Sequence, residues 1–308
     1  MPDILSLGEP LWEMNAIAAE PGKYMLGYGG DTANFCVAAA RQGASVGYIT
    51  RVGSDTFGDG LRDLWQREGI DCSQVAVDQQ ASTGGYFVHH GPTGHQFSYA
   101  RAGSAASQLA PDDIDEEAVE RAQFVHASGI TQAISATARA ATLKLFKVAR
   151  SAGVSTAFDG NFRARLWTAS EAREALAEVL PLTDFFFPSI DDATALSGNA
   201  DHDEILRWAH RLGAQVVMLK LGVEGVKISQ GEGADVMQMA SFPVDTVDAT
   251  GAGDCFAGAT IARLAMGDLL LDAVRYANAA AALTTTQWGA INAIPRRDTV
   301  KTFLSSRV

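Results

Sequence analysis

Short apolar runs alternate along the chain with longer stretches in which apolar side chains recur every three to four positions. The runs DILSLG, SVGYITRVG, FVHASG, STAFDGN, DFFFPS and QVVMLKLG predict buried strands. The stretches DTFGDGLRDLWQREG, SATARAATLKLFKVARSAG, TASEAREALAEVL and DHDEILRWAHRLG predict amphipathic helices. This alternation predicts an α/β fold, with a mostly parallel sheet that is covered by helices on both faces.

The first helix is expected in the stretch DTANFCVAAARQG. Asp31 or Thr32 is expected to cap its N-terminus, and Gly43 to end it. Residues 12–28 and 83–101 carry no helical period, and the second segment resembles two strands around a GPTG turn. Such a hairpin serves as a lid or an oligomer contact, or it is only a surface decoration.

Composition narrows the class of protein. The chain has 308 residues, of which 47% are hydrophobic and 19% charged, and this is typical of a globular protein of one large or two small domains. The net charge of −12 argues against a nucleic-acid or anionic-membrane partner but permits a small anionic ligand. Three widely separated cysteines and the lack of a secretory signal indicate a cytoplasmic protein without disulfides.

Polar residues follow several of the predicted strands. In an open α/β sheet, ligands bind at the carboxyl ends of the strands, so these residues are candidates for a binding site. They are Gly29, Gly30, Asp31 and Asn34 near the start, Asp159, Asn161 and Arg163 in the middle, and Ser189, Asp192, Lys220 and Gly222 later in the chain.

The stretch VDATGAGDCFAGATIARLAMG places two glycines and an acid at the start of a predicted helix. A helix N-terminus has free N–H groups and a partial positive charge, and Gly251 and Gly253 leave room for an anion such as phosphate. Asp254 beside that anion suits a general base, although a tight turn with a helix-capping aspartate is the simpler alternative. The sequence has neither a P-loop nor an early GxGxxG fingerprint.

The same stretch resembles the C-terminal signature of the ribokinase-like (PfkB-type) carbohydrate kinases. Residues 28–61, YGGDTANFCVAAARQGASVGYITRVGSDTFGDGL, resemble the N-terminal signature of that family. The resemblance covers essentially the whole chain. It implies a Rossmann-like three-layer α/β sandwich over residues 1–308, with a small β-sheet lid from about 10–30 and 82–102. It also implies ATP-dependent transfer of the γ-phosphate to a sugar hydroxyl.

The resemblance implies roles for individual residues. Asp254 matches the base, and the backbone of Gly251, Ala252 and Gly253 matches the site of the transferring phosphoryl group. The sugar is expected among Gly30, Asp31, Asn34, Tyr86, Tyr99, Arg101 and Arg163. The nucleotide is expected along Ser189, Lys220, Gly222 and Gly225, with Asn278 and Ala282 on the helix behind the adenine.

Two acids match the positions at which the family binds cations. Many members carry Asn-x-x-Glu near the metal and phosphate, and Ser189 and Asp192 occupy those places here. Asp192 is therefore either a ligand of a Mg²⁺-bound water or only an acid at a helix start. Asp248 lies where many members bind a monovalent cation such as K⁺.

The stretch DGNFRARLW resembles the 2-keto-3-deoxygluconate kinase branch of the family, as do GEPLWEMN, GGDTAN and FSYARAGSA. That sugar acid carries a carboxylate, which an arginine fork binds in bidentate fashion, and Arg101 and Arg163 are the candidates unless they only form surface salt bridges. Tyr86 and Tyr99 either contact the sugar or form the hairpin core.

Other functions remain open on the sequence alone. A fructokinase or another sugar or nucleoside kinase keeps the same chemistry with a neutral acceptor, and a non-catalytic sensor would have no need of Asp254. An exposed lid strand favours a homodimer or a higher homo-oligomer.

Overall fold

The computed structural model describes residues 2–17, 20, 22–91 and 94–307. The strands of its larger sheet are β1 (Ile4–Leu7), β4 (Val46–Gly53), β5 (Val75–Asp78), β8 (Phe124–Ser128), β9 (Ser155–Asp159), β10 (Phe185–Phe186), β11 (Val216–Lys220), β12 (Val226–Ser229) and β13 (Met237–Met239). Within the described residues this sheet has nine strands in the order β13-β12-β11-β10-β9-β8-β1-β4-β5. Strands β12 and β13 add an antiparallel edge, and the other pairs are parallel, so the predicted mostly parallel sheet is confirmed.

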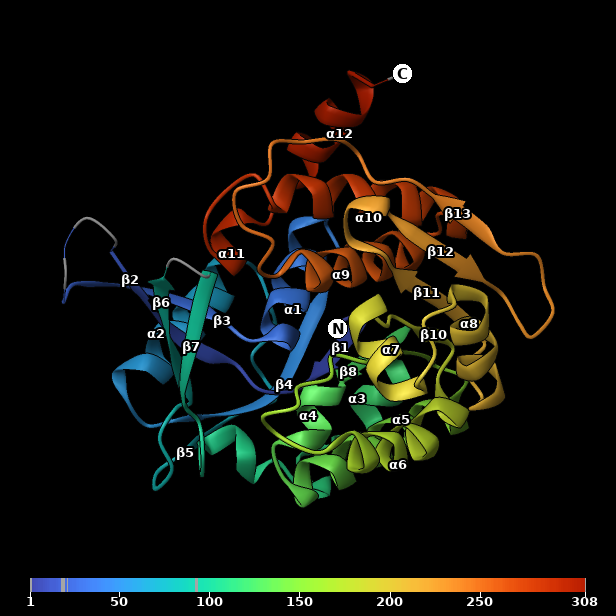
Figure 1. The fold of residues 1–308 in the computed structure, drawn as a ribbon. Helices are drawn as coiled ribbons and strands as arrows, with labels where there is room; N and C mark the ends of the chain where they lie inside the picture. Colours follow the sequence, from blue (N-terminus) through green and yellow to red (C-terminus); the bar gives the residue numbers. More distant parts are fainter. Residues whose placement is uncertain (1, 18–19, 21, 92–93, 308) are drawn as a thin grey trace.

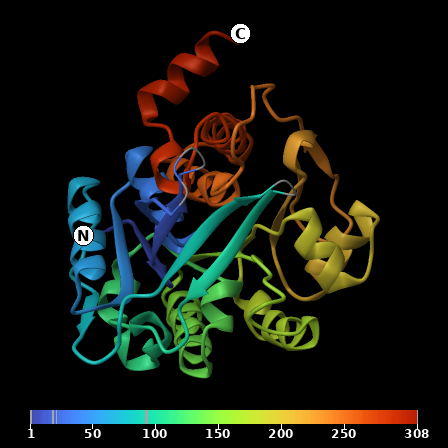
Figure 2. The same cartoon turned by 60° about the vertical axis from the view of Figure 1, so that its left-hand side comes forward.

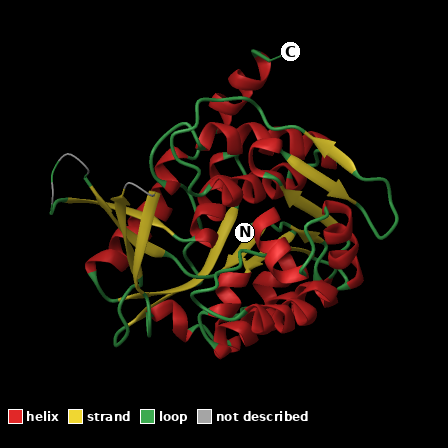
Figure 3. Cartoon of the chain, viewed as in Figure 1, coloured by secondary structure: helices red, strands yellow, loops and turns green. Residues whose placement is uncertain are grey.

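Helices cover both faces of this sheet. They are α1 (Asp31–Arg41), α2 (Thr56–Arg67), α3 (Glu116–Arg121), α4 (Gly129–Ala133), α5 (Ala136–Ala152), α6 (Ala169–Val179), α7 (Ile190–Ser197), α8 (His202–Arg211), α9 (Ala252–Ala265), α10 (Leu270–Thr284), α11 (Ala290–Ala293) and α12 (Arg297–Ser305). Figure 1 shows α9 and α10 above the sheet and α5 and α6 below it, and Figure 3 shows the same layers by element type. The three-layer α/β sandwich is therefore confirmed.

Each face of the sheet has its own apolar core, because successive side chains of a strand point to opposite faces. Ile4 and Met218 pack with α1, α9 and α10 in one core. Leu5 and Val217, their neighbours in the chain, pack with α5, α6 and α8 in the other. This arrangement explains why the central strands are mostly apolar on both faces, and two of their buried polar side chains, Ser6 and His126, hydrogen-bond to each other.

The termini of α5 follow the sequence signals, whereas the start of α1 does not. Helix α5 is capped by Ser135, which accepts the N–H of Ala138, and it ends at Gly153 in the left-handed region (φ 74°). Helix α1 begins at Asp31 with Gly30 as its N-cap, and no side chain caps it. The prediction that Asp31 or Thr32 is the cap is therefore wrong. Gly30 has φ 102°, and a Cβ there would lie 2.4 Å from the Glu9 carbonyl oxygen, so only glycine fits this turn.

A second, smaller sheet is formed by the two segments that lack a helical period. Its strands are β2 (Leu11–Ala16), β3 (Tyr24–Gly29), β6 (Gly85–Gly91) and β7 (Gly94–Ala100), in the order β3-β2-β6-β7. Strands β6 and β7 form the predicted hairpin, although residues 92–93 of its GPTG turn lie outside the described residues. Figure 2 shows this hairpin in front of the large sheet. We call the four strands the lid sheet.

Helices α1 and α9 pack unusually closely, and this contact brings distant parts of the chain together. A Cβ on Gly258 of α9 would lie 2.6 Å from the Phe35 carbonyl oxygen and 2.9 Å from the Ala38 Cβ of α1. Only glycine permits this approach. One turn before Gly258, Asp254 of α9 consequently lies beside Asn34 of α1.

The order of the strands predicts where a ligand binds. After β1 the chain adds β4 and β5 on one side of that strand, and β8 to β11 on the other. Ligands of open α/β sheets bind in the crevice at such a switch point, outside the carboxyl ends of the strands. Within the described residues, no helix has the length and apolar character needed to span a bilayer.

Candidate active site

The N-terminus of α9 lies at the carboxyl end of the large sheet. Gly251 is the N-cap in the left-handed region (φ 78°), and no side chain caps the helix. Asp254, in the first turn, instead accepts a hydrogen bond from Asn34 Nδ2 at 2.8 Å. The interpretation of Asp254 as a helix cap is therefore wrong, and its carboxylate is directed toward α1. The first N–H groups of a helix have no partner within the helix, so they favour an anion here.

Three carboxylates and one ammonium group influence each other around this point. Burial raises the pKa of Asp254 to about 7, and the charges of Asp31 and Asp159 add to this rise. The Asn34 amide and the Lys220 ammonium group oppose it. Burial and the Asp159 charge also raise the pKa of Asp31. Such a raised carboxyl pKa is the property that a general base near neutral pH requires.

Two buried oxygen atoms next to Asp254 have no hydrogen-bond partner within the described residues. They are Asp31 Oδ1 and Asn34 Oδ1, both on α1. The other oxygen of Asp31 accepts from Asn161 Nδ2 at 2.9 Å. A buried acceptor without a donor costs about 1–3 kcal/mol. These two oxygens therefore suit the hydroxyl groups of a polyol, which would supply the donors.

The segment after β9 is sharply bent to make this arrangement. Asn161 has φ 33°, and among the described residues it is the only non-glycine residue with a positive φ. Its N–H donates to Asp159 Oδ1 at 3.2 Å, and its side chain reaches Asp31. Strained backbone of this kind is concentrated at functional sites.

Lys220 ends β11 and extends into the same region. Its ammonium nitrogen lies 2.5 Å from Asp159 Oδ2, and both side chains are largely buried. A Cβ on Gly253 would lie 3.3 Å from the same nitrogen. The predicted phosphoryl site and the predicted nucleotide-side lysine are therefore adjacent in space.

The remaining residues predicted for the nucleotide side lie on neighbouring elements. Gly222 (φ 60°) and Gly225 (φ 95°) bound the turn between β11 and β12. Asn278 of α10 donates to the Ala240 carbonyl oxygen at 3.4 Å, and Ala282 lies one turn further along α10. Ser189 caps α7 by accepting the N–H of Asp192.

The lid sheet contributes polar residues of its own. Tyr86 is buried, and its hydroxyl donates to Glu13 Oε2 at 2.5 Å, whereas Tyr99 is 43% exposed. The core interpretation therefore holds for Tyr86 but not for Tyr99. Arg101 donates to Glu9 in a buried ion pair, and Ser104 Oγ donates to the other oxygen of Glu9 at 3.0 Å.

Arg163 differs from Arg101 in its surroundings. Its side chain is 48% exposed, and its Nη1 lies 3.9 Å from Asp192 Oδ1. The surface-salt-bridge interpretation is therefore wrong for the buried Arg101 and fits Arg163 only as a long contact. Arg165, on the same segment, donates to the Phe97 carbonyl oxygen of the lid sheet at 2.8 Å.

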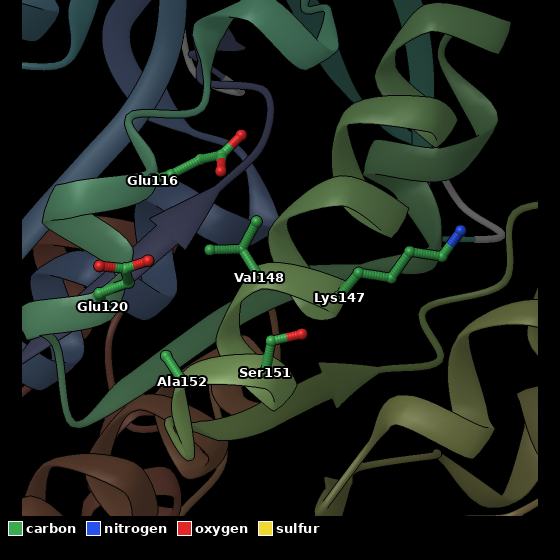
Figure 4. A pocket seen from close by; sticks show the side chains of 6 residues that line it. All are labelled: Glu116, Glu120, Lys147, Val148, Ser151 and Ala152. Atoms are coloured by element: carbon green, nitrogen blue, oxygen red, sulfur yellow. The ribbon is translucent and has the colours of Figure 1, made fainter.

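A surface hollow of about 520 Å³ lies elsewhere on the molecule. Its lining consists of Glu116, Glu120, Lys147, Val148, Ser151 and Ala152 (Figure 4). These residues belong to α3 and to the C-terminal half of α5, which lead into the amino ends of β8 and β9. The hollow therefore lies at the opposite edge of the sheet from Asp254.

Residues 1–297 match the family described as pfkB family carbohydrate kinase. The chain belongs to this family. It is therefore an enzyme of the carbohydrate kinase class, and the predicted fold and family are both confirmed.

Curated relatives of the family cover almost the whole chain. The chain is 36% identical over 304 residues to a 2-dehydro-3-deoxygluconokinase of Thermoproteus tenax, covering 96% of this chain and 92% of that protein. It is 31% identical over 305 residues to a 2-dehydro-3-deoxygluconokinase of Escherichia coli K12, with coverage of 95% and 97%. A probable fructokinase-7 of Arabidopsis thaliana is also 31% identical, with coverage of 94% and 87%.

Solved structures agree with this family assignment. A PfkB protein from Polaromonas sp. JS666 has a TM-score of 0.87 and 32% identity, covering 98% of this chain and 99% of that chain. A putative ribokinase II from E. coli, solved in complex with ATP and Mg²⁺, has a TM-score of 0.90 and 29% identity, with coverage of 99% and 100%.

The two acids predicted to bind cations differ in their surroundings. Asp192 is largely buried, and burial raises its pKa, while the Arg163 charge, 3.9 Å away, opposes this rise. Asp248 Oδ1 accepts from both the N–H (2.9 Å) and the hydroxyl (2.7 Å) of Thr250, and Oδ2 accepts from the Gly289 N–H at 3.0 Å. Asp192 thus fits a Mg²⁺ ion better, whereas Asp248 shapes the loop before α9.

No group of three or more potential metal ligands occurs within the described residues. A Mg²⁺ ion keeps several waters and binds through one or two carboxylates together with phosphate oxygens, so a single carboxylate such as Asp192 is enough on the protein side.

The sequence alone assigns no role to two buried acids of this region. They are Glu9, which pairs with Arg101, and Glu13, which accepts a hydrogen bond from Tyr86 within the lid sheet. Glu9 follows β1 directly, so the rule that selected the other strand-end residues also selects it. Glu13 offers no such signal, because its partner Tyr86 is 73 positions away in the sequence.

Proposed function

We propose that this kinase phosphorylates 2-keto-3-deoxygluconate with ATP and forms 2-keto-3-deoxy-6-phosphogluconate. The observation that carries the proposal is the Asp254 carboxylate, which Asn34 holds at the N-terminus of α9, beside two buried acceptors that have no partner within the described residues. The choice of sugar acid is supported by the 2-dehydro-3-deoxygluconokinases among the relatives, since 2-dehydro- and 2-keto- are two names for the same substrate group.

In the proposed reaction Asp254 takes the proton of the terminal sugar hydroxyl as the oxygen attacks the γ-phosphate. The sugar hydroxyls donate to Asp31 Oδ1 and Asn34 Oδ1, and the turn at Gly30 places these two residues at the start of α1. The first N–H groups of α9, at Ala252 and Gly253, face the charge that develops on the phosphoryl oxygens.

ATP is proposed to lie along the β11 side of the sheet. Ser189, Lys220, Gly222 and Gly225 would contact the phosphates and sugar, with Asn278 and Ala282 behind the adenine. Mg²⁺ would be held by Asp192 through water, and it supplies charge neutralisation for the phosphates. A monovalent cation such as K⁺ would bind at the loop that Asp248 shapes. An ATP-consuming enzyme with three unpaired cysteines fits the cytoplasm.

The carboxylate of the sugar acid is proposed to bind Arg101 and Arg163. Arg163 has most of its donors unused, because its Nη1 contacts only the Phe162 carbonyl oxygen at 2.9 Å and Asp192 at 3.9 Å. The fructokinase alternative is favoured by the fructokinase relatives. It predicts a neutral acceptor and no need for this arginine.

An ADP-release assay with Mg²⁺-ATP distinguishes the sugar-acid kinase from the fructokinase alternative. We expect 2-keto-3-deoxygluconate to be turned over far faster than fructose, ribose or adenosine. Arg163→Met should lower kcat/KM for the sugar acid by about 10- to 100-fold, since a hydrogen bond to a charged group contributes about 1.5–3 kcal/mol. Arg173→Met, which removes an exposed arginine of α6, is the matched control. Faster turnover of fructose, unaffected by Arg163→Met, would overturn the substrate.

The lid sheet is proposed to form a homodimer. Its outer strand β3 exposes Tyr24 (39%), Met25 (61%) and Leu26 (47%), and strand edges of this kind pair readily. Sedimentation at micromolar protein should therefore show a dimer, and Met25→Asp with Leu26→Asp should shift it to monomer. Leu269→Asp, at a similarly exposed apolar site outside the lid, should leave it dimeric. A wild-type monomer would exclude this interface.

A further inference from the structure

Lys220 is fixed by contacts with three separate parts of the chain. Its backbone N–H donates to the Pro188 carbonyl oxygen at 2.9 Å, which ties the end of β11 to the segment before α7. Its ammonium nitrogen lies 2.5 Å from Asp159 Oδ2 at the end of β9. The same nitrogen lies near Gly253, where a Cβ would come within 3.3 Å. The ammonium group is thus held at the N-terminus of α9.

A cation at this place needs an electrostatic reason. A helix N-terminus carries a partial positive charge and favours anions, so a lysine there is unfavourable by itself. The Lys220 side chain is only 16% exposed, which limits screening by solvent. Asp159 offsets the charge in the free protein. Once a phosphoryl group arrives, the lysine and the helix N-terminus both face the same anion.

The neighbouring side chains indicate that a ligand belongs here. Asn34 is only 4% exposed, and its Oδ1 has no hydrogen-bond partner within the described residues, although its Nδ2 holds Asp254. Asp31 Oδ1 is also buried and has no hydrogen-bond partner within the described residues. Acceptors for a hydroxyl-bearing substrate thus lie on α1, next to Asp254, and the Lys220 ammonium group lies beside Gly253, the residue before Asp254.

We propose that Lys220 is a catalytic residue that donates hydrogen bonds to the oxygens of the γ-phosphoryl group during transfer. The acceptor oxygen forms its bond to the γ-phosphorus while the bond from that phosphorus to the bridging oxygen of ADP breaks. The hydroxyl proton goes to Asp254, and Lys220 keeps its own protons. Asp159 holds the ammonium group ready until the phosphoryl group replaces it as partner. The inference rests on the proposed phosphoryl transfer, but not on which sugar is the acceptor.

The test removes the charge of the Lys220 side chain and keeps its approximate length. Lys220→Met should lower kcat by about 10²-fold, a typical loss for one donor to a developing oxyanion, with KM for the sugar changed less than threefold. Lys220→Arg should recover most of this loss. Lys227→Met is the matched control, since Lys227 lies on the adjacent strand β12 and pairs with Asp203 at 2.9 Å. It should behave as wild type.

Binding measurements distinguish catalysis from a structural role. Lys220→Met should weaken binding of ADP with aluminium fluoride, a mimic of the transferring phosphoryl group, by a factor similar to the loss in kcat. Binding of ADP alone should change less than threefold. Equal losses for both ligands, or a kcat within threefold of wild type, would overturn the proposal.

The test of Lys220 does not depend on which sugar is the acceptor. If the wild-type enzyme phosphorylates fructose instead of the sugar acid, the proposed substrate fails and Lys220→Met is assayed with fructose. If no acceptor of the panel is turned over, ADP–aluminium fluoride binding alone decides about Lys220.

Discussion

Replacing Asp254 with asparagine is expected to lower kcat by about 10³-fold or more, while the enzyme still folds and binds ADP. Asparagine keeps the size of the side chain but has no basic carboxylate, so the sugar hydroxyl loses its proton acceptor. General-base catalysis contributes about 10²- to 10⁴-fold. A coupled ADP-release assay with saturating ATP and sugar acid measures the loss.

The matched control is Asp272→Asn. Asp272 is an exposed acid in the first turn of α10, so it shares the helix position of Asp254 but not its surroundings. This variant should keep full activity. If Asp254→Asn retained more than a tenth of wild-type kcat, or if ADP binding fell together with kcat, Asp254 would not be the base.

The pH profile tests the same carboxylate. Its pKa is raised to about 7 by burial and by the charges of Asp31 and Asp159, so the base is protonated below this pH and ionised above it. The value of kcat/KM should therefore fall as the pH drops through about 7. Asp31→Asn removes one of the two raising charges, so it should move the acid limb of the profile to lower pH.

The large sheet and the kinase family could be predicted because their signals are local. The six predicted strands β1, β4, β8, β9, β10 and β11 lie in mostly apolar runs, whereas the edge strands β5, β12 and β13 were not predicted. Gly251, Gly253 and Asp254 lie within four positions. Residues adjacent in the sequence remain adjacent at a helix N-terminus, so the pattern fixes their geometry. The roles of these residues stay predictions, although the structure brings Asp31, Asn34 and Asp254 together.

The partners of these residues could not be predicted, because they are set by packing between distant segments. Asn34 and Asp254 are 220 positions apart, and they meet because Gly258 lets α9 approach α1. The cap of α1 was predicted wrongly for a related reason. Gly30 takes the N-cap position, and the Asp31 carboxylate accepts a hydrogen bond from Asn161, 130 positions away, instead of capping the helix.

The contact between Glu9 and Arg101 could not be predicted either, since 92 positions separate the two residues. Glu9 is buried, and burial raises its pKa to about 7, although Arg101 and Ser104 oppose the rise. Because the folded pKa lies above the ordinary value, the contribution of Glu9 to stability is greatest at low pH. It is lost as the pH rises through about 7. At higher pH, where Glu9 is ionised, the positive charge of Arg101 offsets the cost of this buried negative charge.

Replacing Arg101 with methionine should therefore lower the free energy of unfolding by about 3–5 kcal/mol at pH 8, because it leaves a buried carboxylate without its partner. The loss should be smaller at pH 6, where Glu9 is protonated. Replacing Glu9 and Arg101 together with methionine removes both charges, so this double variant should lose less than half as much. Urea denaturation at both pH values measures all three effects. A loss below 1 kcal/mol for Arg101→Met, or equal losses at the two pH values, would show that the pair does not join the lid sheet to the large sheet.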